Sequence, residues 1–451
     1  MAKASQQFKI TRCDITADRL GGFDGRFYDV RQNVLEINLY ESLDKAYLTG
    51  SIVLLDDKSF FERIRFRGTE RIRIEIAGQD ELTTIMKKTF MIVGIDNAVK
   101  SNENAKSSMV SLSLMEEHAY MSEHMSISRS FSGDLTSVIG SIFVNDLKRN
   151  IDLSYVQQSS NQFDFPVQEN IKGIIPDLTP LDAVDWLLRR ATTKNGSPFF
   201  AYASIHDDNI RFANLESLLV QPAFNSRVPY TYNPANISTA EEQTEVAQGF
   251  TIKDIDITDM QDTLKLIQKF GVSGSYCNTN LNTGEVVTLP FSVRDTLAKM
   301  SNSGSINQKL QNVFDEEAEL GGKKIDEYYS RNIHTITSSG TYGAFKSYSD
   351  EFDEKKFLRK VERNIITSHL FKNMINIIII GTGFGVSKAT VGDIMNVKIV
   401  NDSTETPESA SESDTIDTER SGDYLIYDIR HTFRDTTHEV STNICRLERS
   451  A

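Results

Sequence analysis

The sequence predicts a mainly β protein of the α+β class, with two antiparallel β-barrel domains from an internal duplication, an α+β domain and a helical insertion. Three observations predict this class. Apolar residues alternate with polar ones from Gln32 to Met115, the spacing becomes helical after Met125, and alternation returns from Ile252. The 451 residues allow roughly two to four domains, and 39% hydrophobic with 25% charged residues is a globular composition.

The first alternating region predicts five strands within a barrel domain over residues 1–128. Period two places every second side chain on one face of a strand, so these strands are half-buried. Short polar turns separate them, and closure into an antiparallel barrel or sandwich removes exposed sheet edges. The clearest alternation is in Leu35, Ile37 and Leu39, in Ile72, Ile74 and Ile76, and in Val110, Leu112 and Leu114, with further strands at 50–55 and 90–95.

An α+β domain is expected over residues 129–247, and its first helix has a clear signal. Apolar residues from Leu135 to Leu147 follow the spacing of an amphipathic helix. Asp134 stands immediately before them, where its side chain can accept hydrogen bonds from the free amides of the first turn.

A second helix of this domain is predicted to begin at Thr179-Pro180. Thr179 can cap the helix, and Pro180 suits the first helical position because it has no amide to leave unsatisfied. The helix contains Trp186, the only tryptophan, which we interpret as a core residue. Residues 199–202 and 210–212 predict a hairpin that completes the domain.

The second barrel is expected in two pieces, residues 248–294 and 373–451, separated by a mainly helical insertion over residues 295–372. The loop at 401–420 carries seven acidic residues and many serines and threonines, so we expect it to be a mobile surface excursion. The strands of the two pieces are predicted at 252–257, 286–293, 375–380, 395–400, 424–434 and 439–447, and the last helix of the insertion at 354–372.

An internal duplication is indicated by equal spacing of apolar residues in the two β regions. Each set is preceded by a strand that follows a glycine, Gly68 or Gly392, and is followed by a polar turn and an alternating strand. We therefore expect the two barrels to superpose. The matched residues are Phe90, Ile92 and Ile95 in the first region and Tyr424, Ile426 and Ile429 in the second.

Residues 377–386 are the part of the chain that comes nearest to a nucleotide-binding motif. Three alternating glycines follow an apolar strand, but the third glycine of a dinucleotide loop would stand at Val386. A second β pattern, rather than a helix, is expected after them. We interpret the glycines as a strand end with a bulge, and no cofactor is predicted.

The histidines give no metal-binding pattern. Only two pairs are close in sequence, His118 with His124 and His431 with His438, and neither has the i, i+4 spacing of a zinc-binding helix. We interpret all seven as ordinary surface or hairpin residues. They are His118, His124, His206, His334, His369, His431 and His438.

No catalytic residues are predicted either. Cys13, Cys277 and Cys445 are far apart, which makes a disulfide framework improbable and a Cys-x-x-Cys site impossible, so we interpret them as core or strand residues. No Gly-x-Ser-x-Gly motif is present. The acidic pairs Asp56-Asp57 and Asp207-Asp208 are interpreted as turn residues, where aspartate is favoured for local hydrogen bonds.

The charge and the apolar runs exclude two classes of partner. The chain has 49 Lys and Arg against 63 Asp and Glu, a net charge of -14, and no basic block. Specific nucleic-acid binding is therefore not expected, because it needs clustered cations. No apolar stretch approaches the ~20 residues of a membrane helix, and the N-terminus lacks a secretory pattern, so we expect no membrane anchor and synthesis in a cytoplasm.

The order of these parts resembles the central hub protein of the baseplate in contractile-tailed bacteriophages, a design related to the hub part of type VI secretion spikes. The resemblance covers nearly the full chain and is one of order and pattern rather than of an invariant signature. The residues that carry it are Leu35–Leu43, the helix after Leu178-Thr179-Pro180, and the closing hairpin strand Asp423–His431.

The resemblance implies a structural virion protein of the tail baseplate, assembled in the host cytoplasm. It implies a homotrimer whose two tube-like barrels per chain form a pseudo-sixfold ring. Its expected partners are the tail-spike protein below, the tail tube protein above and the surrounding baseplate wedge proteins. The acidic balance fits a tube through which DNA slides without binding.

Two rival functions remain open from the sequence. One is a tail-associated cell-wall hydrolase with the helical insertion as its active domain, because glycoside hydrolysis needs a carboxylate pair and the insertion is rich in acids. The other is a plain tail-tube or sheath subunit. The acids available to a hydrolase are Glu316, Glu317, Glu319, Asp350, Glu351, Asp353 and Glu354, which we interpret as solvated helix faces.

Overall fold

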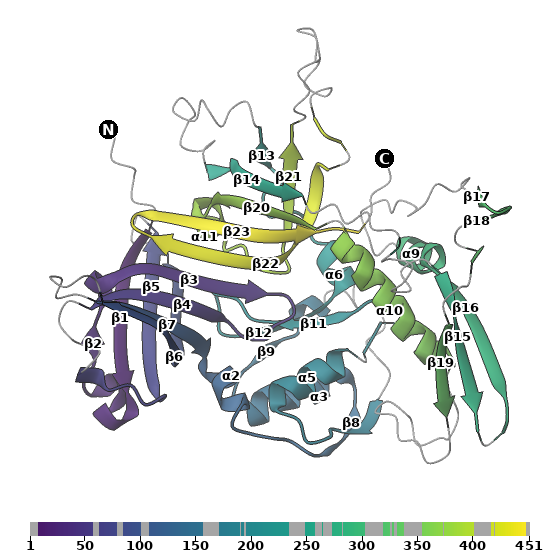
Figure 1. Cartoon of the computed structure of the whole chain (residues 1–451), viewed down its shortest axis with the longest axis horizontal. Coiled ribbons are helices and arrows are strands. Elements are labelled where there is room, and N and C mark those ends of the chain that lie inside the picture. The colour runs from purple at the N-terminus through teal and green to yellow at the C-terminus, as the bar shows by residue number, and fades with distance from the viewer. Residues whose placement is uncertain are drawn as a thin grey trace, which may run out of the picture.

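The structure is a computed structural model of the chain, and Figure 1 shows a curved β-sheet with helices and smaller sheets on one side of it. The residues that it describes are 8–56, 63–78, 84–100, 108–156, 171–189, 191–193, 195–233, 249–257, 264, 273–281, 283–302, 319–324, 327–328, 332–337, 354–372, 374–400, 416–418 and 420–447. The expectation of a mobile acidic loop at 401–420 falls almost entirely outside them.

The N-terminal strand group supplies one half of the large sheet. Its strands pair in the order β3-β4-β7-β6-β5-β1-β2, and each pairing is antiparallel. Burial alternates along β4 residue by residue, as period two predicts. The group comprises β1 (Phe8–Ala17), β2 (Tyr28–Asp29), β3 (Val34–Ser42), β4 (Thr49–Asp56), β5 (Glu70–Gly78), β6 (Thr84–Lys100) and β7 (Ser108–Glu116), with short 3-10 turns at Asp18–Leu20, Gly22–Asp24 and Arg31–Asn33.

The C-terminal strand group supplies the other half. Its strands pair in the order β14-β20-β23-β22, with β21 on the edge of β22 and β13 on β21. These pairings are antiparallel except for that between β13 and β21, which is parallel. The strands are β13 (Tyr230–Tyr232), β14 (Ile252–Ile257), β20 (Ile375–Ile380), β21 (Ile394–Ile399), β22 (Gly422–Arg434) and β23 (Thr437–Cys445). Antiparallel pairing between β22 and β3 joins the two groups into one sheet of 13 strands.

The intervening segment between β7 and β13 contains the predicted helices and hairpin. Asp134 caps α3 through the Ser137 amide, and Thr179 caps α5 through the Asp182 amide, with Pro180 at the first helical position. The predicted starts of both helices are confirmed. The segment contains α2 (Glu117–Ser122), β8 (Ser130–Gly133), α3 (Leu135–Ser141) continued by a π-helical turn (Ile142–Asp146), β9 (Ile151–Asp152), β10 (Ile171–Ile174), α5 (Pro180–Leu188), β11 (Phe199–Tyr202), β12 (Ile210–Asn214) and α6 (Leu215–Leu219).

A separate three-stranded sheet corrects the expected course of residues 273–372. β15 (Ser273–Asn280) pairs antiparallel with β16 (Val286–Ser292) and parallel with β19 (Asn332–Thr337), so these residues are not part of the large sheet. The helical prediction holds for α9 (Val293–Asn302) and α10 (Glu354–Lys372) and is wrong for β19 and for the hairpin of β17 (Glu319–Leu320) with β18 (Lys323–Lys324).

The glycine run after β20 is also different from the expectation. A short helix, α11 (Thr382–Ser387), follows β20, where a second β pattern was predicted. Gly381 itself has φ -73°, a conformation open to any residue. The glycine at this position is therefore explained by its small size and not by its backbone freedom. The helix ends at Lys388, which has φ 54°.

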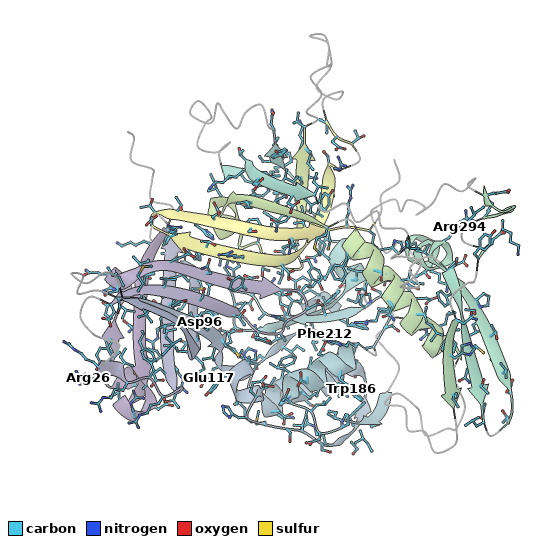
Figure 2. The ribbon with its side chains drawn as sticks, in the orientation of Figure 1. Arg26, Asp96, Glu117, Trp186, Phe212 and Arg294 are labelled. Atoms are coloured by element: carbon cyan, nitrogen blue, oxygen red, sulfur yellow. The ribbon has the colours of Figure 1, made fainter. Side chains whose placement is uncertain are left out.

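Three groups of buried apolar side chains hold these parts together. The largest lies between the N-terminal strand group and helices α3 and α5, and it also includes Phe433 of β22. The second joins the C-terminal strand group to β11, α6 and α10, and a small third one lies under β15 and β16 against α9 and α10. Figure 2 shows Trp186 on α5 and Phe212 on β12, and both belong to or pack against the first group. Within the described ranges, none of the helices combines the length and apolar character needed to cross a membrane.

Candidate functional site: the seam between the two strand groups

The seam is the antiparallel pairing of β22 with β3, and it exists because β22 is long enough to have two neighbours on one edge. Residues 422–425 of β22 pair with β21, and residues 428–434 pair with residues 36–42 of β3. A bulge at Tyr427 separates the two stretches. The extra residue bends β22. Its first part therefore pairs with β21 of the C-terminal strand group, and its second part pairs with β3 of the N-terminal strand group.

On one face of the seam, a single side-chain oxygen collects three hydrogen bonds. Nε and Nη2 of Arg430 donate to Oδ1 of Asn38 at 3.2 and 3.1 Å, and the Thr432 hydroxyl donates to the same atom at 2.9 Å. The Arg430 guanidinium also lies 5.9 Å from the ring centroid of Tyr40. These contacts fix the register of β22 on β3 by side chains as well as by the backbone ladder.

On the other face of the seam, Glu41 is completely buried between three parts of the chain. Its carboxylate accepts hydrogen bonds from the Ile205 amide at 3.2 Å, from the Val391 amide at 3.4 Å and from the Thr390 hydroxyl, and Nε2 of His431 lies 3.4 Å from Oε1. β3, the β11–β12 turn and the loop before β21 therefore meet on one carboxylate. A buried carboxylate is tolerated only with such partners.

Two further histidine rings complete this buried cluster. Nδ1 of His431 and Nε2 of His438 are 3.1 Å apart, so one donates to the other across the β22–β23 hairpin. His206 lies between two backbone carbonyls, with Nδ1 3.1 Å from Ile85 O and Nε2 3.2 Å from Ala389 O. The cluster thus connects both strand groups and the intervening segment.

The environment sets the charges of this cluster. Burial alone would raise the pKa of Glu41, but the contact and charge of His431, with smaller contributions from His206 and Thr390, lower it below its ordinary value. Burial lowers the pKa of His206 and lowers that of His438 well below its ordinary value, and the neighbouring histidines act in the same direction. An ionised Glu41 beside neutral His206 and His438 is the arrangement that these shifts favour at neutral pH.

A second charged cluster, buried at Lys88 and Glu116 and exposed at Asp208, attaches the intervening segment to the N-terminal strand group. Nζ of Lys88 on β6 lies 3.5 Å from Oε1 of Glu116 and 3.1 Å from Oδ1 of Asp208, and it donates to the Asp207 carbonyl. Arg149 reaches the same Glu116 oxygen at 3.3 Å, and the other oxygen accepts the Leu48 amide at 2.8 Å. Every charge in the cluster has an opposite charge in contact with it.

The interpretation of all histidines as surface or hairpin residues is wrong for part of the set. His118 and His369 are buried away from any hairpin, and His431 and His438 are hairpin residues but are also buried, whereas His124 and His334 are exposed. Burial is possible because the rings have partners: Nε2 of His118 lies 2.8 Å from Ala46 O, and Nδ1 accepts from Nε of Arg149 at 3.2 Å. Among the residues that the structure describes, no group of three or more His, Cys, Asp or Glu side chains has a metal-binding arrangement.

The other residues singled out in the sequence lie apart from the seam. The three cysteines are free thiols on β1, β15 and β23, as the strand interpretation predicts. Asp207 and Asp208 occupy the turn between β11 and β12, but they also bind Lys88, which the sequence did not indicate. Of the acids considered for a hydrolase, Glu319 is exposed on β17, Glu354 begins α10, and the other five lie outside the described residues.

Sequence reasoning missed Glu41, although a signal was present. Ile37, Leu39 and Glu41 alternate along one strand, so period two places the carboxylate on the same inward face as the two apolar side chains. A carboxylate at a core-facing position requires buried donors. The identity of these donors, which come from residues about 160 and 350 positions away, was not available from the strand itself.

Comparison with solved structures finds the same fold in two tail proteins, one of them from a prophage. The tail protein from Neisseria meningitidis MC58 aligns with a TM-score of 0.51 and 11% identity, covering 98% of this chain and 97% of that one. The 43 kDa tail protein of prophage MuSo2 from Shewanella oneidensis aligns with a TM-score of 0.50 and 11% identity, covering 96% and 97%. No family model and no curated protein matches the sequence. The likeness therefore extends over the whole chain, and it shows that this protein has the fold of these two tail proteins.

Proposed function

We propose that the chain is a structural protein of a phage tail, the central hub of the baseplate, and that three copies form a pseudo-sixfold ring joining the tail tube to the membrane-puncturing spike. The full-length fold likeness to two tail proteins supports the tail assignment. The observation that carries the ring is a repeat of strand order and register within one chain, because two equivalent units per chain in a trimer give six similar units.

The repeat begins with the order of pairing. In the N-terminal strand group, β3, β4, β7, β6 and β5 are consecutive neighbours, and in the C-terminal strand group β14, β20, β23, β22 and β21 are consecutive neighbours. The two series follow the same order of connection along the chain. The series differ beyond β5 and β21, where β1 pairs antiparallel and β13 parallel.

The register repeats together with the order, because two bulges occur at equivalent places. The bulge at Val93 between β6 and β7 corresponds to that at Tyr427 between β22 and β23, and the bulge at Leu35 between β3 and β4 corresponds to that at Lys253 between β14 and β20. Aligned on the first pair of bulges, Phe90, Ile92 and Ile95 coincide with Tyr424, Ile426 and Ile429. This supports the duplication that the spacing predicts.

A carboxylate at the start of the β5 and β21 positions adds a third correspondence. Glu70 accepts the Arg67 amide three residues before it, at 2.9 Å, and Asp393 accepts the Thr390 amide three residues before it, at 3.0 Å. Register places Glu70 and Asp393 at the same position, one residue before the pairings of Arg71 with Met91 and Ile394 with Leu425. Loop closure by a carboxylate, buried at Glu70 and half-buried at Asp393, is thus common to both units.

The proposed domains follow from this division. Residues 1–128 form the first tube-like unit, and the α+β domain, predicted over residues 129–247, ends before β13, which pairs with β21. The second unit takes β13, residues 248–272 and residues 373–451. Residues 273–294, predicted earlier for the second barrel, go to the insertion because β15 and β16 pair with β19. The tail tube above, the spike below and the wedge proteins around the ring are the proposed partners, and the net charge of -14 suits a channel that DNA passes without binding.

The mass of the purified protein in solution tests this proposal. Light scattering should give the mass of three 50.8 kDa chains, and the trimer should co-sediment with purified tube and spike proteins of the same phage. A spike truncated at its tube-proximal end is the matched control and should not co-sediment. A monomer would contradict the ring, and a monomer that degrades purified cell wall would support the alternative, a cell-wall hydrolase.

A further inference from the structure

We infer that the ring closes through a second seam between subunits, in which the distal half of β6 in one copy pairs with β14 of the next copy. The partner is a second copy of this chain, and the inference rests on the trimer proposed above. It assigns the contact to two named strand edges and fixes its polarity and approximate register, which the trimer alone does not do.

The distal half of β6 has a neighbour on one edge. β5 pairs with β6 only as far as Met91, whereas β7 pairs with it as far as Lys100. Beyond Met91, no strand among the described residues lies on the β5 side of β6. At the equivalent place in β22, β21 pairs only as far as Leu425 and β3 takes over the same edge from Asp428.

Burial at equivalent positions shows what the missing neighbour would cover. Ile429 of β22, opposite β3, has 1% of its surface exposed, whereas Ile95 of β6 has 44% exposed. Asp96, labelled in Figure 2, is exposed beside it. An exposed apolar residue on a strand edge favours association with another strand.

β14 carries the complementary edge. Its bulge at Lys253 matches that at Leu35 of β3, so Ile255 and Ile257 occupy the positions of Ile37 and Leu39. Ile37 and Leu39 are fully buried: β3 has β4 on one side and β22 on the other, and both side chains face the largest apolar group. Ile255 and Ile257 are only half-buried, since β14 is the last strand of its path and pairs with β20 alone over these residues.

The free edges of β6 and β14 do not pair with each other within one chain. Six strands, β20, β23, β22, β3, β4 and β7, separate β14 from β6 along the sheet, and Figure 1 shows the two edge strands well apart on it. Two different edges on one chain give a head-to-tail contact, and such contacts form a ring when the rotation from copy to copy closes after three copies. Repeating the β3–β22 geometry at each junction makes the sheet continuous around three copies.

The intrachain seam gives the expected alignment. β14 should run antiparallel to β6, as β3 does to β22. The β3–β22 register can be carried over to β14 and β6 by matching their bulges and allowing for one extra bulge in β6 at Asp96. It places Ile255 opposite Lys100 and Ile257 opposite Ala98. In this register Ile95 lies opposite residue 259, just past the last described residue of β14 and diagonal to Ile257. Each junction would then cover Ile255, Ile257 and the adjacent side of Ile95, which one chain leaves partly exposed.

Two edge variants test this seam. Ile95→Lys places a charge on the β6 edge and Ile257→Lys places one on the β14 edge, the device by which natural sheets block edge pairing. Ile174→Lys on β10, where the isoleucine is 59% exposed outside the large sheet, is the matched control. Each edge variant should show a threefold loss of mass in light scattering, and the control should remain a trimer.

Mixing the two edge variants gives the decisive result. The Ile95→Lys chain keeps a competent β14 and the Ile257→Lys chain keeps a competent β6 edge, so an equimolar mixture should form a dimer with one intact seam and no trimer. A mixture that stays monomeric, or edge variants that remain trimers, would overturn the seam. A wild-type chain that is itself monomeric would instead overturn the trimer of the proposed function.

Hydrogen exchange on the unmodified protein keeps the inference testable if a variant does not fold. Within residues 94–100 and 252–257, the backbone amides that do not bond to β7 or β20 should exchange slowly in the trimer and at least tenfold faster after dilution to monomer, because an unpaired edge amide is open to water. Amides of the intrachain seam, residues 428–434, should be unchanged. Equal exchange of residues 94–100 in both states would contradict the second seam.

Discussion

Gly381 lies directly against the ring of His438: a Cβ built on Gly381 would be 2.2 Å from Nδ1 of that ring. The Gly381 amide also donates to the His438 carbonyl at 2.8 Å, so the backbones of β20 and β23 are held together at this point. The absence of a side chain at position 381 is therefore what allows His438 to sit in the buried cluster beside Glu41.

Gly381→Ala should destabilise the protein by about 2 to 3 kcal/mol, because the methyl group must displace a buried ring that contacts His431. Denaturant unfolding measures the difference. Gly140→Ala in α3 is the control, since its Cβ would be 3.7 Å from Ile151 and alanine favours a helix, so its change should be neutral or stabilising. Equal effects of the two substitutions would contradict the close approach.

The buried histidines predict a loss of stability on mild acidification. Burial lowers the pKa of His118, His206 and His438 in the folded state, so the unfolded chain binds more protons below its ordinary histidine pKa of about 6.5. Stability is therefore present above pH ~6.5 and decreases as the pH falls below it. The lowered pKa of Glu41 acts in the same direction at still lower pH.

Below pH ~6.5 the free energy of unfolding should fall by up to about 1.4 kcal/mol per pH unit for each histidine that stays neutral in the folded protein. Urea unfolding at several pH values between 7.5 and 5 measures it, a range chosen around the histidine pKa of about 6.5. His118→Gln should reduce the slope by one such step, because an amide can replace the contact to Ala46 O without titrating. His124→Gln, at an exposed histidine, is the control for the chemical change itself.

Local signals in the sequence were sufficient for the starts of α3 and α5 and for many of the strands, but not for α2, α6 or α11. Thr179 and Pro180 mark the start of α5 because capping and the missing proline amide are properties of the residues themselves. The alternation in β4 and β5 likewise follows from period two. These elements needed no knowledge of distant partners.

Long-range pairing explains what the sequence did not reveal. β19 is parallel to β15 and pairs Asn332 with Ser275, 57 residues away, and nothing in either strand specifies the other. The partners of Lys88 and Glu41 are similarly distant. Glu41 could have been suspected from its inward position, but the cluster around it arises only when β3, β22 and the β11–β12 turn come together.

Lys88 and its neighbour Lys87 provide a matched pair of substitutions. Lys88→Met should destabilise the protein by roughly 3 to 5 kcal/mol, because it removes one cation from a buried cluster and leaves Glu116 with Arg149 alone. Lys87→Met should change stability by less than about 0.5 kcal/mol, since the Lys87 side chain is 71% exposed. Its Nζ lies 3.6 Å from Oε1 of Glu75, a surface ion pair of the kind that contributes little. Thermal or denaturant unfolding of both variants decides the point, and a small effect at Lys88 would show that the cluster contributes little.

Gly392 combines a left-handed backbone with a close neighbour, and the two costs can be separated. Its φ is +87°, and a Cβ there would lie 2.6 Å from Oη of Tyr202, a fully buried residue of β11. Gly392→Ala should therefore destabilise the protein by about 3 kcal/mol, roughly 1 from the backbone conformation and the rest from the clash. Gly284→Ala has a similar φ of +70° with open space around the Cβ, so it should cost only the backbone part.

Adding Tyr202→Phe to Gly392→Ala removes the nearest atom and should recover part of the loss, measured as the free energy of unfolding of the double variant against both single variants. A double variant no more stable than the additive expectation would mean that the steric conflict lies with the ring carbons, which are 2.8 and 3.2 Å away, rather than with the hydroxyl.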